Sequence, residues 1–139
     1  STGDSRCDIP YMRIAEMYLI EAEAKAKLSD PTAAQVLYDL TIARNAAYVK
    51  STATGQALVD EILLHRRIEL WGEGFRFYDL KRTNSALDRV GPATLPATTS
   101  NHVTSVALTM SIPAGDKRWQ WLFPRAEINA NPAIKQNPN

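Results

Sequence analysis

The segment from Ile62 to Arg82, which reads ILLHRRIELWGEGFRFYDLKR, constrains the fold of this chain more than any other stretch. It begins with an apolar helical pattern, is interrupted by glycines at positions 72 and 74, and resumes a helical pattern at Phe75. Opposite charges recur three positions apart at Arg66–Glu69, Glu73–Arg76, Arg76–Asp79 and Asp79–Arg82. Residues at this spacing are neighbours on a helix, and an arginine guanidinium forms paired hydrogen bonds with a carboxylate. The segment therefore predicts a structural network of ion pairs that fixes a bend between two helices.

The same carboxylates allow a catalytic interpretation. Glycoside hydrolysis uses two carboxyl groups, and Glu69, Glu73 and Asp79 lie close together in the sequence. We favour the structural interpretation because each of the three has an arginine at helical spacing, whereas catalysis needs a group that is left available to react. The sequence also contains no phosphate-binding glycine loop and no Gly-x-Ser-x-Gly elbow. We expect the protein not to be an enzyme.

Neither a metal site nor a cofactor is expected. His65 and Glu69 are four residues apart and can supply two ligands, but a zinc site needs three or four. The other histidine is His102, in a Thr-rich stretch, and the single cysteine, Cys7, has no sequence neighbour that marks it as a nucleophile.

Composition narrows the class of protein. The 139 residues suit one domain, and 16 basic against 15 acidic residues leave a net charge of +1. Nucleic acid or an anionic membrane surface would need clustered positive charge, so we expect neither as a partner. No apolar run approaches the roughly 20 residues that span a bilayer, and no signal peptide is apparent. We expect residues 1–9 to be a disordered segment, residues 10–139 to form the domain, and any targeting signal to lie upstream.

Four helices are expected, at residues 10–28, 31–47, 56–71 and 75–81. The expected inner positions are Ala15, Tyr18, Leu19, Ala22 and Ala26 in the first helix, Val36, Leu37, Leu40 and Ala43 in the second, and Leu64, Ile68 and Trp71 in the third. Ile14 and Met17 widen the face of the first helix, so we expect burial on more than one side. The short connection Ser29-Asp30-Pro31 makes the first two helices antiparallel. The pattern is typical of an all-α fold built from helix pairs.

The chain changes character after Thr83. Residues 91–116 have no helical period, and only residues 102–108 suggest a short strand. Residues 125–139 predict one helical turn and a tail whose Asn-Pro pairs keep it extended or turned along an existing surface. We expect a long irregular C-terminal segment.

Trp119 and Trp121 are candidate ligand contacts. If their segment is extended, alternate side chains point the same way and the two indoles share a face. Such rings with their N–H groups suit a sugar, which has an apolar face and a rim of hydroxyls. The simpler interpretation, which we favour, is an aromatic clamp that closes the helical core.

Three segments share a distinctive pattern. They are YMRIAEMYLIEAEA at residues 11–24, RRIELWGEGFRFYDLKR at 66–82, and FPRAEINANPAIKQNP at 123–138. In this order they resemble the C-terminal region of the SusD/RagB family, nutrient-binding lipoproteins of the Bacteroidetes outer membrane. Two departures are His65, where the family usually has Glu, and Arg125-Ala126, where it usually has Ile-Pro.

The resemblance implies an all-α, TPR-like scaffold, of which this chain is a C-terminal fragment. It also implies a lipid anchor outside this chain, a place on the outer-membrane surface, and a SusC-like TonB-dependent transporter as partner. The implied function is capture of an oligosaccharide or peptide nutrient and its handover to that transporter. A protein-interaction scaffold without direct ligand binding is the alternative. The residues of the family's signature are scaffold residues, here Arg66, Glu69, Glu73, Arg76, Asp79 and Arg82.

Overall fold

The structure, a computed structural model, describes residues 12–89 and 111–137. The chain divides into two compact units, Ser1–Phe75 and Arg76–Asn139. The segment expected to be disordered at residues 1–9 and the strand expected at 102–108 lie outside the described residues.

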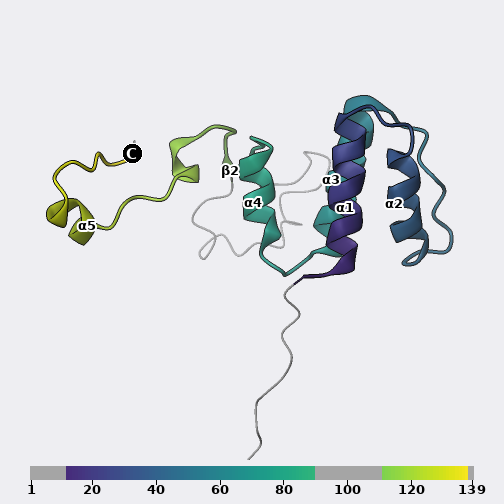
Figure 1. Ribbon diagram of the computed structural model, residues 1–139, viewed down its shortest axis with the longest axis horizontal. Coiled ribbons are helices and arrows are strands. Elements are labelled where there is room, and N and C mark those ends of the chain that lie inside the picture. The colour runs from purple at the N-terminus through teal and green to yellow at the C-terminus, as the bar shows by residue number, and fades with distance from the viewer. Residues whose placement is uncertain (1–11, 90–110, 138–139) are drawn as a thin grey trace, which may run out of the picture. The chain divides into compact units, whose positions relative to one another are not determined.

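Three helices form the first unit: α1 (Ile14–Lys27), α2 (Ala33–Ile42) and α3 (Gly55–Glu69). α1 contacts both of the other helices, and the short connection makes α1 and α2 antiparallel (Figure 1). The core is one apolar cluster whose largest fully buried side chains are Leu19, Leu37 and Ile62. Small residues allow the close approach of the helices, because the buried positions of α1 include Ala15, Ala22 and Ala26.

The two ends of α1 are fixed in different ways. The helix begins at Ile14, four residues after the expected start at Pro10, because Arg13 is extended with φ −107° and ψ 137°. At the other end, Ser29 adopts φ 59°, Asp30 N–H donates to the carbonyl of Lys25 at 2.9 Å, and Ser29 N–H to that of Ala26 at 3.1 Å. This is the left-handed termination of a helix, and it turns the chain sharply toward α2.

The prediction that α1 is buried on several sides is wrong. Ile14 is 78% exposed, and Met17 and Tyr18 are each 39% exposed. Within the first unit, α1 packs mainly against α2 and α3, and the flank with these side chains does not take part in that packing.

α2 ends at Ile42, earlier than expected, and Ala43 is exposed. Asn45 competes with the helix, because its Oδ1 accepts a hydrogen bond from the N–H of Ala47 at 3.0 Å. The next residues form a turn in which Tyr48 N–H donates to the carbonyl of Asn45 at 2.9 Å. The shorter helix leaves residues 43–54 as a connection that runs back to α3.

α3 has nearly the expected bounds but buries the opposite stripe. Leu64, Ile68 and Trp71, expected inside, are 54%, 61% and 85% exposed. The buried side chains of α3 are Leu58, Val59, Ile62 and Arg66. Both stripes have helical spacing, so periodicity alone could not choose between them.

The second unit contains α4 (Phe75–Arg82), whose first residue belongs to the first unit, and α5 (Arg125–Ala130). β1 (Leu87–Asp88) and β2 (Ser111–Ile112) form an antiparallel pair with Leu87 opposite Ile112. A 3-10 helix, η2, spans Lys117–Trp119. The expected all-α fold is confirmed, with α4 within one residue of its predicted end and two short strands added.

The C-terminal tail lies along the segment that precedes α5. The side-chain amide of Gln136 accepts from the N–H of Phe123 at 2.8 Å and donates to its carbonyl at 3.1 Å. Asn137 donates from Nδ2 to the carbonyl of Trp121 at 2.5 Å. These bonds connect the residues that follow α5 to residues 121–123, which precede it.

No helix within residues 12–89 or 111–137 has the length and apolar composition of a membrane-spanning segment.

Candidate ligand-binding site

An aromatic cluster surrounds Phe77 of α4 in the second unit. The ring centroid of Phe77 lies 5.7 Å from that of Trp119, 6.4 Å from that of Trp121 and 5.5 Å from that of Tyr78. The contacts with Trp121 and Tyr78 are nearly perpendicular, at 75° and 83°, a favourable arrangement for aromatic rings. The two tryptophans singled out from the sequence therefore meet the same phenylalanine.

Trp119 and Trp121 differ sharply in exposure. Trp119 is 8% exposed, and its Nε1–H donates to the carbonyl of Pro113 at 2.8 Å. Trp121 is 77% exposed. The expectation of a fully extended segment fails at Trp119, which ends the 3-10 helix, whereas Gln120 is extended with φ −102° and ψ 135°. Trp119 is a packing residue with its polar atom satisfied, and Trp121 presents its indole to solvent.

The 3-10 helix that carries Trp119 has a charged cap. Asp116 Oδ1 accepts from the backbone N–H of Arg118 at 2.8 Å and from its Nε at 2.9 Å. Hydrogen bonds from the Arg118 side chain, then from its backbone N–H, lower the pKa of Asp116 to about 2. The cap is therefore ionised at neutral pH and fixes the direction in which Trp119 leaves the backbone.

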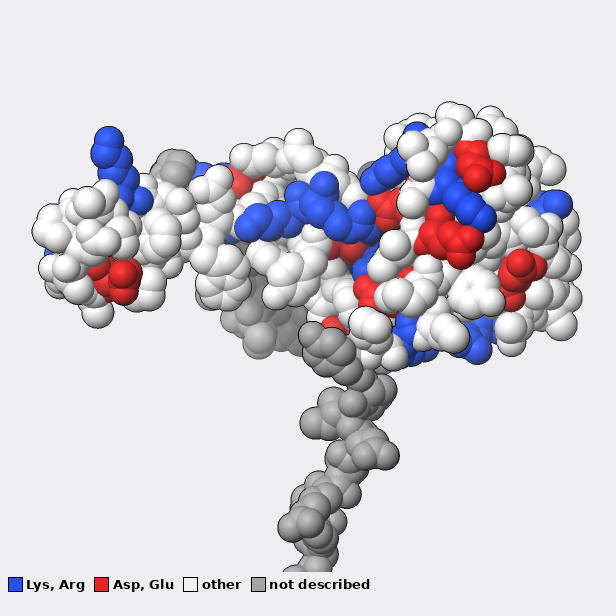
Figure 2. Space-filling view, in the orientation of Figure 1, with Lys and Arg blue, Asp and Glu red and all other residues white. Residues whose placement is uncertain are grey.

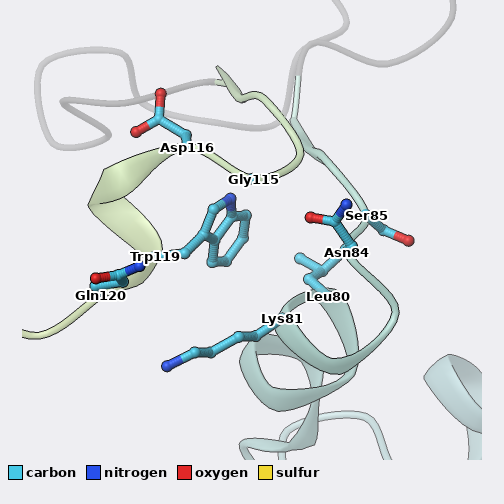
Figure 3. Close-up of a pocket in the computed structure, with 8 residues that line it drawn as sticks. All are labelled: Leu80, Lys81, Asn84, Ser85, Gly115, Asp116, Trp119 and Gln120. Carbon is cyan, nitrogen blue, oxygen red and sulfur yellow. The ribbon is translucent and has the colours of Figure 1, made fainter.

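A hollow of about 160 Å³ lies beside Trp119 (Figure 3). Its lining residues are Leu80, Lys81, Asn84, Ser85, Gly115, Asp116, Trp119 and Gln120. In Figure 3 the indole of Trp119 projects from the 3-10 helix toward α4, with Leu80 and Asn84 across from it. Asn84 adopts φ 51°, which turns the chain directly after α4. The amide, hydroxyl, ammonium and carboxylate groups around this aromatic ring can form hydrogen bonds with a hydroxylated ligand.

The carboxylates of the first unit form ion pairs that reach far along the sequence. Glu69 Oε1 accepts from Nη2 of Arg13 at 2.6 Å and from Nη2 of Arg44 at 3.0 Å. Arg13 also pairs with Glu73. Hydrogen bonding to Arg44 is the main reason that the pKa of Glu69 is lowered, with the charge of Arg13 adding to it. Figure 2 shows basic and acidic side chains intermingled on the visible face over α1 to α3.

Two other charged residues of the signature are buried. Arg66 is 5% exposed, donates to Glu16 of α1 at 2.9 Å, and places its guanidinium carbon 5.3 Å from the ring centroid of Phe75. Asp79 is 6% exposed and accepts from Nε of Arg82 at 2.8 Å, which is one of the pairs expected from the sequence. These positions support a structural role for the signature.

The histidine considered as a metal ligand, His65, packs against Tyr48 with ring centroids 5.3 Å apart. Among the described residues, no group of three or more His, Cys, Asp or Glu side chains could hold a metal ion. Cys7 and His102 lie outside the described residues.

A second hollow, of about 240 Å³, lies in the first unit near Tyr48 and His65. We did not predict it from the sequence, because its residues come from the end of α2, the following turn and α3. The signal that could have found it is the turn-forming Asn45, which brings Tyr48 back toward α3.

Comparison with known proteins agrees with this architecture. Residues 1–139 match the profile of the SusD family. The chain belongs to the SusD family. A SusD-like protein, P38, from Formosa agariphila is 37% identical over 94 residues, which are 61% of this chain and 19% of that protein. The crystal structure of a SusD-like carbohydrate binding protein from Bacteroides vulgatus superposes with a TM-score of 0.71 at 31% identity, over 88% of this chain and 29% of that one.

The chain thus spans less than a third of the length of the SusD-like proteins it matches. The predicted family membership is confirmed. In this member of the SusD family Arg66, Glu69 and Asp79 form ion pairs.

Proposed function

We propose that this protein binds carbohydrate without transforming it, as part of nutrient capture at a bacterial cell surface. The observation that carries the proposal is Trp121, which is 77% exposed although its ring rests on Phe77 and its carbonyl is held by Asn137. An indole fixed from behind and open in front can stack on the apolar face of a sugar with little loss of side-chain entropy. The name of the B. vulgatus structure, a carbohydrate binding protein, supports the same class of ligand.

Neighbouring groups suit the rest of such a ligand. Tyr78, 67% exposed, packs edge-on against Phe77 and adds a second open ring with a hydroxyl group. The hollow beside Trp119 supplies polar side chains, including Asn84, Ser85 and Gln120. A glycan or a peptide nutrient can use both kinds of contact, and the rings favour the glycan because flat sugar faces match them.

The proposal includes a cellular location and a partner protein. In the longer protein, a lipid anchor outside this chain would hold the molecule at the outer membrane, and captured ligand would pass to a SusC-like TonB-dependent transporter. The ion pairs of Glu69 and Asp79 act in this proposal only as scaffold, which is why we assign the protein no catalysis.

Trp121→Ala tests the binding role. Titration calorimetry of the full-length protein with a panel of oligosaccharides should show about tenfold weaker binding for the variant, the effect of losing one stacked ring. Leu122→Ala, at a neighbouring side chain that is 50% exposed, is the matched control and should bind normally. Equal affinities for wild type and Trp121→Ala would overturn the role of Trp121, and absence of binding across the panel would overturn carbohydrate capture.

A protein-interaction scaffold is the second candidate, favoured by the exposed apolar side chains of the first unit. Ile14, Leu64 and Trp71 are 78%, 54% and 85% exposed, and large exposed apolar side chains are candidate contacts for a partner protein. Replacing Ile14 and Leu64 with Ser should then abolish co-purification of the full-length protein with the transporter while oligosaccharide binding stays unchanged. Unchanged co-purification would exclude these residues from the interface.

A further inference from the structure

The hollow of the first unit is a small, mixed cavity of about 240 Å³ between the end of α2 and the second half of α3. The residues that line it are Leu40, Thr41, Arg44, Asn45, Tyr48, His65, Ile68 and Glu69. Leu40 and Ile68 form its aliphatic part, with Leu40 8% and Ile68 61% exposed. Its volume is below the ≈ 300 to 1,000 Å³ of sites for drug-sized ligands, so it suits a single ring.

Tyr48 and His65 make an aromatic corner. Their ring centroids are 5.3 Å apart and their planes meet at 79°. Tyr38 packs on Tyr48 at 6.1 Å, and the Tyr48 hydroxyl donates to Oε1 of Glu61 at 2.8 Å. Burial, followed by this hydrogen bond, raises the pKa of Tyr48, so the phenol stays neutral. The ring is therefore held in one orientation before any ligand arrives.

Planar charged groups close the other side. Arg44 donates to Glu69 twice, from Nε at 3.1 Å and from Nη2 at 3.0 Å, and Arg13 donates to the same carboxylate. A guanidinium has five N–H groups, so Arg44 retains donors beyond these two bonds. The Oδ1 of Asn45 is bonded to the backbone of Ala47, which leaves the orientation of its amide fixed. The hollow thus has hydrogen-bond donors and an ionised acceptor in fixed positions.

We propose that this hollow is a second carbohydrate site, which holds one sugar ring and is separate from Trp121. The apolar face of the ring would lie against Tyr48, His65 and Ile68, and its hydroxyls would meet Arg44, Glu69 and Asn45. The class of ligand rests on the proposed function, whereas the position of the site rests on the geometry above.

Other ligand classes fit this hollow less well. An anion would meet the carboxylate of Glu69, which already neutralises Arg44. A wholly apolar ring would desolvate the Arg44–Glu69 pair without giving it new hydrogen bonds. A neutral ring with hydroxyl groups satisfies both parts of the lining.

Nuclear magnetic resonance titration of the full chain tests the site directly. Glucose, galactose, mannose and N-acetylglucosamine are added singly, and amide shifts of Asn45, Tyr48 and His65 are followed. At least one sugar should shift these signals saturably, and Ile68→Ser should weaken that binding about fivefold by removing apolar contact. Leu64→Ser is the matched control, since Leu64 is an exposed residue of the same helix that does not line the hollow.

His65→Ala is a second variant, and it should weaken binding as Ile68→Ser does while its folded spectrum is retained. If no sugar shifts the three amides, or if Leu64→Ser weakens binding as much as Ile68→Ser, the site is refuted. Trp121→Ala separates this result from the proposed function: it should remove shifts around residues 119–121 and leave those around Tyr48. Loss of both sets of shifts in Trp121→Ala would refute a separate site, and shifts confined to Tyr48 and His65 would refute the role of Trp121 alone.

Discussion

The two units of this chain are stabilised by different means. In the first, eleven buried apolar residues from α1, α2 and α3 form one cluster. In the described part of the second, the buried residues are Asp79, Leu80 and Trp119, and hydrogen bonds from Gln136 and Asn137 secure the aromatic segment. The first unit is thus stabilised mainly by apolar burial, and the second depends more on individual polar and aromatic contacts.

The first unit therefore has the larger apolar core, although both units expose large aromatic side chains. A continuous core gives a rigid frame, in which ion pairs such as Arg66–Glu16 are buried between helices. A segment held by a few side chains can expose large rings, as Trp121 and Tyr78 do, without a core to bury them. Substitutions should therefore affect the first unit through cavities and the second through single lost bonds.

Leu19→Ala should have the largest effect. Leu19 is fully buried in α1, and truncating such a side chain leaves a cavity that lowers the free energy of unfolding by about 3 kcal/mol. Hydrogen exchange followed by mass spectrometry should show faster exchange throughout α1 to α3. The matched control is Ile20→Ala, at the next residue, which is 49% exposed and should change stability by less than about 1 kcal/mol. Similar effects of the two would mean that the apolar cluster does not dominate this unit.

Asp79→Ala should destabilise the second unit by about 2 kcal/mol, because it removes a buried carboxylate and leaves its partners unsatisfied. Exchange should accelerate in α4 more than in α1. Asp60→Ala is the control, since Asp60 is exposed and bonded only within its helix to Gln56 at 2.8 Å among the described contacts. A loss below about 0.5 kcal/mol would show that Asp79 behaves as a surface group.

Trp119→Phe should reduce stability by about 1 kcal/mol or more, because the Nε1–H that donates to Pro113 is lost and the smaller ring leaves space at a buried position. Trp121→Phe has no corresponding indole bond to lose among the described contacts, and should leave the exchange of residues 117–123 unchanged. Equal effects of the two substitutions would contradict the division of Trp119 as packing residue and Trp121 as exposed ring.

The sequence predicted the fold best where residues that are close in the sequence contact each other. α4 was placed almost to the residue because its charge spacing is that of a helix, and Asp79–Arg82 is a contact within one turn. The face of α3 was assigned wrongly because Leu58 and Ile62 form one apolar stripe while Leu64 and Ile68 form another, and only packing against α1 selects between them.

The candidate sites were less accessible to sequence reasoning. The exposed Trp121 was singled out, but its difference from Trp119 depends on the 3-10 helix and on Pro113. The hollow at Tyr48 depends on contacts that a local pattern does not contain, such as Arg44 with Glu69, 25 residues apart. Arg13 meets Glu69 across 56 residues, so this partner of Glu69 could not be predicted from one-turn spacing.

The smallest expected effect concerns the pH dependence of the Glu69 ion pairs. The pKa of Glu69 is lowered below its usual 4.5, chiefly by Arg44, so its ionised form is the one that stabilises the folded state. That contribution is complete above pH 4.5 and is lost as the pH falls through the lower pKa of the folded protein. Because Arg13 and Arg44 are 36% and 55% exposed, solvent screening limits the contribution to about 1 kcal/mol or less.

Glu69→Gln tests this assignment by chemical denaturation at a series of pH values. Wild type should exceed the variant in stability at pH 7, and the difference should shrink as the pH is lowered below 4.5. Glu21→Gln serves as control, because its pair with Lys25 lies within one helix and its side chain is 52% exposed, so only a small loss is expected at pH 7. A stability difference for Glu69→Gln that stays constant down to pH 3 would mean that the shape of the side chain matters and its charge does not. The ion pairs of the first unit would then stabilise it through packing, as its apolar core does, and the two units would differ only in how much apolar surface they bury.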